Sequence, residues 1–341
     1  MSPSKNKLMH DTLLSLPSNA TALSGRLCLV TGGAGFIGSH LVDALRSQGA
    51  AVRVLDNFST GYQHNLAHTE SDPNVEVVEG DASEADVVHA AMKNVEIVFH
   101  GAAMASVPRS MREPDLCHAW CTTSTVHLLN AAAENKVARF VLSSTSAAYG
   151  DSPFVSKREV DAVNPLSPYA ASKLASEAYL KAFNSGFGLE TVILRYFNVF
   201  GPRQDPQSEY SAVIPRFVSM ILSGDRPIIY GDGNQSRDFV FVRDVALANL
   251  LAATMPGVAG GTYNIARGER TTLLELLTTL RNILGQNIEP IHEATRAGDV
   301  RDSLADITQA RQHLQFEPTV TMGEGLALSV DYYRSIVQAG V

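Results

Sequence analysis

The sequence predicts an α/β fold with a doubly wound parallel sheet and a smaller C-terminal lobe. Short apolar runs alternate with helical segments up to about residue 200, which is the pattern of parallel strands joined by crossover helices. From Gly201 onward, proline and glycine interrupt the chain often and the expected elements are shorter. We therefore expect an N-terminal extension at 1–24, a sheet domain at 25–200 and a lobe at 201–341, of which 239–254 is able to return to the main sheet.

The expected elements follow one another in a regular order. The first strand runs into a glycine-rich turn, TGGAGFIG, and this turn opens a helix that ends at a glycine. Strands and helices then alternate, an order that predicts right-handed crossovers. The strands are expected at 26–30, 51–56, 75–81, 95–103, 139–144 and 190–201, and the helices at 39–49, 83–93, 114–136 and from Pro168 onward.

The composition limits the kinds of partner. With 45% hydrophobic residues among 341, the chain can bury a sizeable core. Its formal net charge of −8 disfavours a nucleic acid or an anionic membrane surface as the main partner. The sequence shows no secretory leader and no run of about 18 apolar residues, so we expect a soluble cytoplasmic protein.

We expect no metal site. Three cysteines are too few for a disulfide framework and suit a reducing compartment. Cys117 and Cys121 lie four positions apart on an expected helix without further ligands, so packing is favoured over metal binding or redox chemistry. His64 and His68 follow a polar turn without a neighbouring carboxylate, and we expect them to be solvated.

The glycine-rich turn has the features of a dinucleotide site. Gly32 permits a tight turn, Gly35 a close approach of the backbone to a phosphate, and Gly38 close packing of helix on strand. Asp56 ends the next strand, where its carboxylate can accept hydrogen bonds from an adenosine ribose and would repel a 2′-phosphate. The pattern predicts NAD rather than NADP; the alternative is a structural turn without a ligand.

A second stretch, SPYAASK, places Tyr169 and Lys173 four positions apart with small residues between them. At this spacing two side chains share a helix face. A free tyrosine has a pKa of about 10, so a base at neutral pH needs nearby positive charge, which Lys173 and the nicotinamide of NAD⁺ would supply. We therefore expect Tyr169 to act as an acid/base with a lowered pKa. The alternative is a packed tyrosine beside a solvated lysine.

Together the two motifs resemble the extended short-chain dehydrogenase/reductase superfamily over most of the chain. This resemblance implies a Rossmann domain, Tyr169 as the catalytic acid/base, and Lys173 as the residue that binds the nicotinamide ribose and tunes the tyrosine. It also implies that Thr145, in SSTSAAYG, hydrogen-bonds the substrate oxygen. Ser144 and Ser146 flank it, either sharing that work or serving as turn hydroxyls.

A narrower resemblance is carried by the stretches LDNFSTG, ASVPRS, RYFNVFGPRQDP, AVIPRF, YGDGNQSRDFVFV and GDVRDSLAD. They are similar to UDP-sugar 4-epimerases of the NAD-dependent epimerase/dehydratase family, closest to the group acting on UDP-N-acetylglucosamine and UDP-N-acetylgalactosamine. The resemblance implies a homodimer joined through the 114–136 helix and the helix that carries Tyr169. It implies NAD contacts at Gly32, Gly35, Phe36, Ile37, Gly38, Asp56, Asn57, Asp81, Ala82, Ala102 and Lys173, and UDP-sugar contacts at Ser106, Thr145, Ser146, Asn198, Val213, Arg237, Arg301 and Ser303.

Within this resemblance, Asn198, Arg237 and Arg301 hold the substrate diphosphate. Arginine suits that task because its guanidinium presents a fork of donors to phosphate oxygens. The alternative is a set of surface ion pairs, of Arg237 with Asp238 and of Arg301 with Asp299 or Asp302.

Ser303 bears on the choice of sugar. Glucose-restricted epimerases carry a bulky tyrosine at the matching position, so a serine leaves room for a 2-acetamido group; the alternative is an ordinary loop serine. No carboxylate follows Thr145, whereas related dehydratases carry an Asp-Glu pair there and decarboxylases a glutamate, and this favours epimerisation.

One departure concerns the helix beside the nicotinamide, where Cys121 and Ser124 replace the asparagine and glycine of the family's N-x-x-G-T stretch. This puts cofactor affinity and substrate range in question. Two other functions stay open: a sugar-nucleotide dehydrogenase, reductase or decarboxylase of the same fold, and a non-catalytic protein that senses NAD or a nucleotide.

Overall fold

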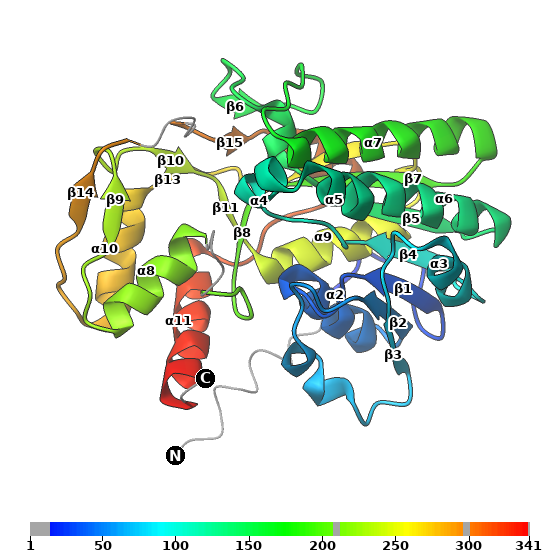
Figure 1. Ribbon diagram of the computed structural model, residues 1–341, viewed down its shortest axis with the longest axis horizontal. Helices are drawn as coiled ribbons and strands as arrows, with labels where there is room; N and C mark the ends of the chain where they lie inside the picture. The colour runs from blue at the N-terminus through cyan, green and yellow to red at the C-terminus, as the bar shows by residue number, and fades with distance from the viewer. Residues whose placement is uncertain (1–13, 207–211, 296–300, 340–341) are drawn as a thin grey trace.

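The computed structural model describes residues 14–206, 212–295 and 301–339 of the chain. It consists of a sheet domain with helices on both faces and a smaller lobe beside it (Figure 1). Of the expected N-terminal extension, residues 1–13 lie outside the described residues. The part that follows packs on the sheet domain, where Leu14, Leu16 and Leu23 join the core.

Seven parallel strands form the sheet, so the predicted doubly wound architecture is confirmed. Their spatial order is β12 (Thr262–Ile265), β7 (Thr191–Tyr196), β5 (Arg139–Thr145), β4 (Ile97–His100), β1 (Leu27–Thr31), β2 (Ala51–Asp56) and β3 (Val75–Glu79). The chain builds outward from β1 to β3 and then from β4 to β12, so the order reverses between β1 and β4. Ligands of such sheets bind outside the carboxyl ends of the strands at this reversal.

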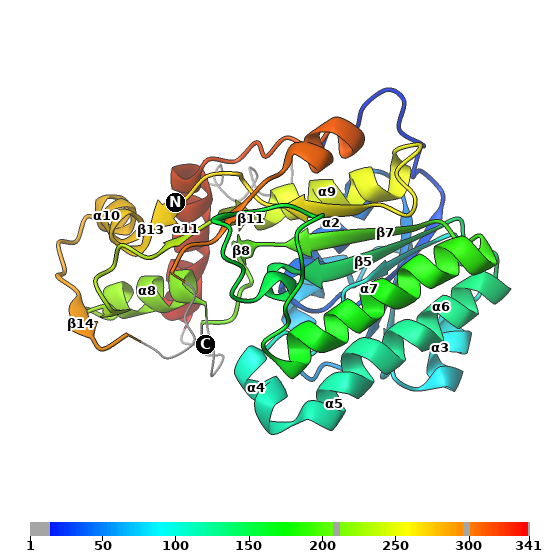
Figure 2. The same ribbon diagram turned by 90° about the horizontal axis from the view of Figure 1, so that it is seen from above.

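The sheet separates two apolar cores. Helices α2 (Phe36–Ser47) and α9 (Val242–Thr254) cover one face, and α3 (Ala85–Ala91), α6 (Ser124–Glu134) and α7 (Pro168–Phe187) cover the other (Figure 2). On β1, Cys28 and Val30 belong to the first core, whereas Leu29 between them belongs to the second. Successive strand residues point to opposite faces, which explains why strands buried on both sides read as continuous apolar runs.

Two elements from beyond residue 200 belong to the sheet domain. Helix α9 packs on β5, β7 and α2, and β12 pairs with β7 as the edge strand. The lobe is therefore built from stretches of chain that leave the sheet domain and return to it.

The lobe has a core of its own beneath three helices, α8 (Val213–Leu222), α10 (Leu273–Leu284) and α11 (Met322–Ala339). In α8, Ile214, Phe217, Val218 and Ile221 are buried at helical spacing. Short strand pairs complete the lobe and its junction with the sheet domain: β8 (Asn198–Phe200) with β11 (Phe239–Phe241), β9 (Ile228–Tyr230) with β14 (Ile291–Glu293), β10 (Ser236–Arg237) with β13 (Thr271–Thr272), and β6 (Ser156–Lys157) with β15 (Leu304–Ala305).

The long helix expected at 114–136 is not uniform. It comprises α5 (Pro114–His118), a π-helical turn at Ala119–Thr123 and α6, which ends at Glu134. Such turns insert one residue and occur often at functional sites. Within the described residues, no helix combines the length and the apolar character needed to cross a membrane.

Candidate active site

The glycine-rich turn lies at the carboxyl end of β1, against the chain that follows β4. Gly32 has a φ of +69° and a Cβ there would lie 2.8 Å from the backbone nitrogen of Ala102. A Cβ on Gly38 would overlap the carbonyl oxygen of Gly32. Glycine is therefore needed at both positions, at the first for a positive φ and at the second for close packing of α2 on the turn.

The other predicted residues of this turn form the start of α2. Gly35 is the residue before the helix and has no side chain that could cap it, so the first N–H groups of α2 are available to a ligand. Phe36 and Ile37 are half-buried and pack against the core of the lobe. The turn thus lies between the sheet domain and the lobe.

Asp56 faces the turn from the end of β2. Its Oδ2 accepts the Ala34 N–H and its Oδ1 accepts the Phe58 N–H, each over 2.9 Å. Burial raises the pKa of Asp56 above its usual value. The carboxylate holds the chain on both sides of the turn, and each oxygen keeps a second lone pair for a ligand hydroxyl.

Asp81, two residues after the end of β3, links the predicted cofactor residue Asn57 to Trp120, which the sequence did not reveal. Its Oδ2 accepts Asn57 Nδ2 and Trp120 Nε1, each over 2.9 Å. Burial alone would raise the pKa of Asp81, but hydrogen bonds from Ser83, Asn57 and Trp120 outweigh it and lower the pKa. Ala82 is buried beside it.

The guanidinium of Arg109 lies over the Trp120 ring, with its Cζ 5.1 Å from the ring centroid. Arg109 belongs to α4 (Val107–Arg112), and its N–H donates to the Ser106 side chain that caps the helix. The predicted substrate residue Ser106 is therefore engaged in capping and lies at the start of the segment that Trp120 holds.

Tyr169 and Lys173 lie on the first turns of α7. Ser167 caps the helix by accepting the Ala170 N–H over 3.2 Å, and Pro168 occupies the first helical position, both common choices at a helix start. Lys173 is only 2% exposed, and its Nζ donates to the Ser143 carbonyl over 2.8 Å. The alternative of a solvated lysine is therefore wrong.

Thr145 is the last residue of β5 and hydrogen-bonds Tyr169, a contact that favours the phenolate. Burial nevertheless raises the pKa of Tyr169, and the neighbouring thiol pair Cys121 and Cys117 raises it further. The expected lowering of this pKa included the charge of bound NAD⁺ and stays a prediction; without the cofactor, the partial burial of Tyr169 favours the neutral phenol. The pKa of Lys173 is lowered for the same reason, burial.

Of the two serines beside Thr145, the structure separates the roles. Ser144 donates to Glu177 Oε1 over 2.5 Å, and Glu177 is also bound by Arg195. Ser146 lies half-buried in a 3₁₀ turn at Ser146–Tyr149. The sequence signal that could have revealed the Glu177–Arg195 pair is Arg195 itself, a single charged residue in the otherwise apolar, buried strand TVILRY.

Cys117 and Cys121 pack with Met104 beside Tyr169, which agrees with the expected packing role, and all three cysteines of the chain are buried and free. Cys121 lies in the π-helical turn. Its hydrogen bond with Cys117 and the charge of Lys173 lower the pKa of Cys121. The chain thus places a thiol next to the tyrosine where the family has an asparagine.

Most of the predicted diphosphate residues meet around β10 and β11. Asn198 Nδ2 donates to the Asp238 carbonyl over 3.2 Å. Arg237 Nη1 donates to the carbonyls of Ser236 and Arg301, over 2.9 and 3.2 Å. Ser303 joins them through its N–H, which donates to the Ser236 carbonyl over 3.1 Å. Val213 is the first residue of α8.

The acidic residues that the sequence suggested as ion-pair partners of Arg237 and Arg301 have other partners or are not described. Asp238 is buried and accepts backbone N–H groups of Arg267, Gly268 and Ala305, and its burial raises its pKa to about 6. Arg301 is paired with Asp232 at 3.1 Å, with both side chains largely exposed. Of the other proposed partners, Asp302 accepts the Ser236 hydroxyl and Asp299 lies outside the described residues.

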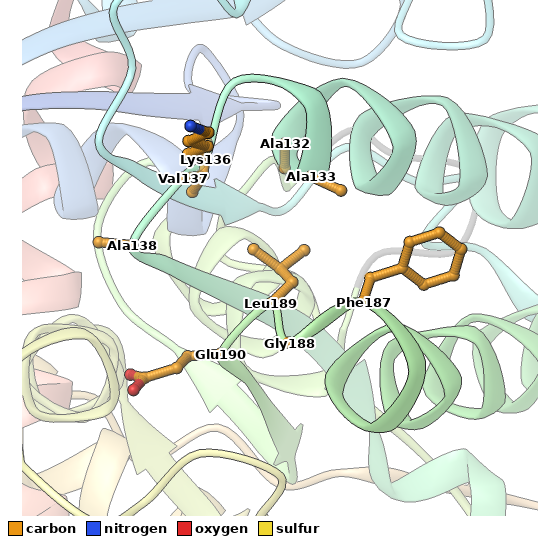
Figure 3. A pocket seen from close by; sticks show the side chains of 9 residues that line it. All are labelled: Ala132, Ala133, Lys136, Val137, Ala138, Phe187, Gly188, Leu189 and Glu190. Atoms are coloured by element: carbon orange, nitrogen blue, oxygen red, sulfur yellow. The ribbon is translucent and has the colours of Figure 1, made fainter.

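The expectation that His64 and His68 are solvated and lack a neighbouring carboxylate is wrong for His68. Its Nε2 is 2.6 Å from Asp43 Oδ1, because the fold brings α2 against this loop, and His64 stacks on Tyr62 with ring centroids 5.1 Å apart. A surface hollow of about 490 Å³ lies at the amino ends of β5 and β7, opposite Thr145 (Figure 3). It is lined by Ala132, Ala133, Lys136, Val137, Ala138, Phe187, Gly188, Leu189 and Glu190.

The sheet, the glycine turn and the pair of Tyr169 with the buried Lys173 define a dinucleotide-binding protein of the short-chain dehydrogenase/reductase type. Residues 28–266 match the NAD dependent epimerase/dehydratase family, and the chain belongs to it. The UDP-glucose 4-epimerase of Mycolicibacterium smegmatis is 38% identical over 309 residues, which are 90% of this chain and 98% of that one.

Solved structures agree with this assignment. A UDP-N-acetylglucosamine 4-epimerase from Methanobrevibacter ruminantium M1, in complex with UDP-N-acetylmuramic acid, is 40% identical with a TM-score of 0.87, covering 92% of this chain and 99% of that one. The UDP-glucose 4-epimerase of Thermus thermophilus, in complex with NAD, is 36% identical with a TM-score of 0.82, covering 90% and 99%.

Proposed function

We propose that this protein is an NAD-dependent 4-epimerase of UDP-sugars. The observation that carries the proposal is the surroundings of Tyr169. Among the described residues, Met104, Cys117 and Cys121 pack against Tyr169 and Ser146 and Ala147 follow Thr145, and none of these is a carboxylate. A dehydratase or decarboxylase needs a further acid or base beside the tyrosine, whereas epimerisation at C4 needs only one proton acceptor and a hydride acceptor.

The residues present fit NAD. Glycines at 32 and 38 keep the turn free of side chains, so the backbone N–H groups at the start of α2 can bind the pyrophosphate. Asp56 has lone pairs left for the ribose, and its charge disfavours a 2′-phosphate. When bound, NAD⁺ supplies reversible acceptance of a hydride from C4 of the sugar, so the reaction has no net redox change.

The chain's own residues supply the proton transfer. Tyr169 as phenolate takes the proton of the sugar 4-hydroxyl and later returns it. Burial opposes that phenolate, so the positive charges of Lys173 and of bound NAD⁺ have to offset burial. Thr145 donates a hydrogen bond to the same substrate oxygen, and Lys173 also binds the nicotinamide ribose.

Substrate binding is assigned mainly to 201–341 and NAD binding to 25–200. Asn198, Arg237 and Arg301 bind the diphosphate, and the exposed Arg301–Asp232 pair is weak enough to exchange for a phosphate. Ser106, Ser146 and Val213 contact the sugar and the uracil. A 4-keto sugar that remains bound by its diphosphate can turn and present its other face.

We further propose that N-acetylated UDP-sugars are substrates, since Ser303 leaves space for the acetamido group.

A homodimer through α5–α6 and α7 is supported by exposed apolar residues on α7, namely Tyr179 and Phe187. Light scattering after size exclusion should give twice the chain mass of 36.6 kDa. The cytoplasmic location stays a prediction.

The test is an incubation of purified protein with UDP-N-acetylglucosamine, without added cofactor, followed by proton NMR. Formation of UDP-N-acetylgalactosamine, abolished by Tyr169→Phe, would support both the chemistry and retained NAD. Epimerisation of UDP-glucose alone would contradict the role of Ser303. No product from either sugar, even after NAD is supplied, would reject the epimerase proposal in favour of a reductase or a binding protein.

A further inference from the structure

A buried ion pair lies directly beneath the proposed catalytic residues. Tyr169, Lys173 and Glu177 are spaced by four on α7, so they follow one another along one face of the helix. Each meets a consecutive part of β5: Thr145 hydrogen-bonds Tyr169, the Ser143 carbonyl accepts Lys173, and the Ser144 hydroxyl donates to Glu177.

Arg195 binds Glu177 from the neighbouring strand, β7. Its Nε lies 2.9 Å from Oε1 and its Nη2 lies 2.7 Å from Oε2, so each carboxylate oxygen accepts one arginine donor. Both side chains are only 3% exposed. Arg195 is held in turn by the Tyr149 ring, 4.9 Å from its Cζ, and the Tyr149 hydroxyl donates to Asn264 over 2.7 Å.

The charges in this region explain what the pair does. Lys173 and Arg195 are two buried cations near one buried carboxylate, Glu177, which acts on both of them. A carboxylate with free oxygens one helical turn from a buried ammonium would attract it strongly, because low polarity strengthens the interaction. The forked guanidinium matches a carboxylate better than an ammonium does.

We propose that Arg195 is a positioning residue for Lys173. By binding both oxygens of Glu177, it prevents that carboxylate from pairing with the ammonium group, whose charge remains available to Tyr169. This inference rests on the proposed roles of Tyr169 and Lys173 in epimerisation.

The other titratable groups around these side chains are few. Cys117 and Cys121, from α5 and the π-helical turn, act on both Tyr169 and Lys173. His100, at the end of β4, is fully buried, and both burial and the charge of Lys173 lower its pKa. Tyr149 and Glu159 face Arg195 from the other side. Substitution of Arg195 removes a charge that lowers the pKa of both Tyr149 and Glu159, and the single and double variants share this change.

The test compares Arg195→Met with the double variant Arg195→Met/Glu177→Gln. The single variant leaves Glu177 without its partner, so Lys173 should pair with it, and the pKa of Tyr169 should rise by about one unit, a tenfold smaller phenolate fraction. The double variant removes the competing carboxylate as well, and the pKa of Tyr169 should return to the wild-type value. Replacing both members of a buried pair by neutral groups is often tolerated.

Two measurements report the ionisation of Tyr169. The first is the tyrosinate absorbance of each protein minus that of its Tyr169→Phe counterpart, titrated with pH and independent of turnover. The second is the acidic limb of the kcat profile, which should move in parallel. Circular dichroism confirms folding; if Arg195→Met does not fold, Arg195→Gln, which keeps one donor for Glu177, carries the same expectation.

Three results would overturn the proposal. A folded neutral variant at Arg195 that titrates like wild type would show that Glu177 does not compete for Lys173. An equal shift in the single and double variants, or a double variant that cannot fold, would assign the pair a structural role only. If Tyr169→Phe itself epimerises normally, the proposed role of Tyr169 fails instead, and if wild type epimerises neither UDP-sugar, the proposed function fails, whatever Arg195 does.

Discussion

Gly38→Ala tests how closely α2 approaches the glycine turn. The added methyl would overlap the Gly32 carbonyl oxygen and lie 2.8 Å from both the Gly32 carbonyl carbon and the Gly33 Cα, where ordinary contacts are 3.4–4 Å. These are backbone atoms that cannot rotate away, so the helix or the turn must shift by at least about 1 Å to clear the Gly32 carbonyl oxygen. Overpacking of this kind costs about 1–3 kcal/mol, and we expect about 3 because no side chain can yield.

For a chain of 341 residues, a loss of about 3 kcal/mol corresponds to a fall in Tm of about 4 °C. The same shift displaces the N–H groups that bind the pyrophosphate. Losing one such charge-assisted hydrogen bond, at about 1.5–3 kcal/mol, weakens NAD binding about 10- to 100-fold. Calorimetry gives the Tm, and acid release followed by enzymatic assay gives the NAD content.

Gly186→Ala is the matched control. Gly186 also lies in a helix, α7, but a Cβ there meets nothing within 4 Å. Alanine should leave NAD content unchanged and raise stability by up to about 1 kcal/mol. If Gly38→Ala behaves like this control, with wild-type Tm and NAD content, the reasoning about close packing at the turn is refuted.

Three further outcomes are expected. Tyr169→Phe should lower kcat by about 10²–10⁴ while NAD remains bound; retention of kcat would remove Tyr169 from the mechanism. Ser303→Tyr should abolish turnover of N-acetylated UDP-sugars and spare UDP-glucose, whereas equal loss on both would contradict a role in sugar choice. Burial raises the pKa of Asp238 to about 6, so the stability it contributes at low pH is lost as the pH rises toward 6. Urea unfolding of wild type at pH of about 4.5 and 7 should therefore show a relative loss of about 2 kcal/mol that Asp238→Asn lacks; parallel curves would contradict it.

Local features of the chain were predictable because each depends on near neighbours in sequence. The glycine turn needs only a strand before it and a helix after it, and the SPYAASK spacing places Tyr169 and Lys173 on one face of any helix they form. Alternation of apolar runs with helical segments predicts the parallel sheet. Asp56 is found at the expected strand end for the same reason.

Long-range contacts were not predictable in the same way. Trp120 and Asp81 are 39 positions apart, and Glu177 and Arg195 are 18 apart. Neither separation along the sequence reveals that the two residues touch, because the contact depends on which strands become neighbours in the sheet. The return of β12 to the sheet edge and the ion pair of Arg301 with Asp232 belong to the same class.

The sequence by itself determined the dinucleotide-binding sheet, the glycine turn and the tyrosine–lysine helix, since these follow from short-range pattern and residue type. Only the tertiary structure decided the electrostatic state of the site. Burial raises the pKa of Tyr169 and lowers that of Lys173, while Arg195 engages Glu177, a carboxylate one helical turn beyond Lys173. Burial and charge balance depend on side chains brought together from distant parts of the chain, and spacing along the sequence does not contain that information.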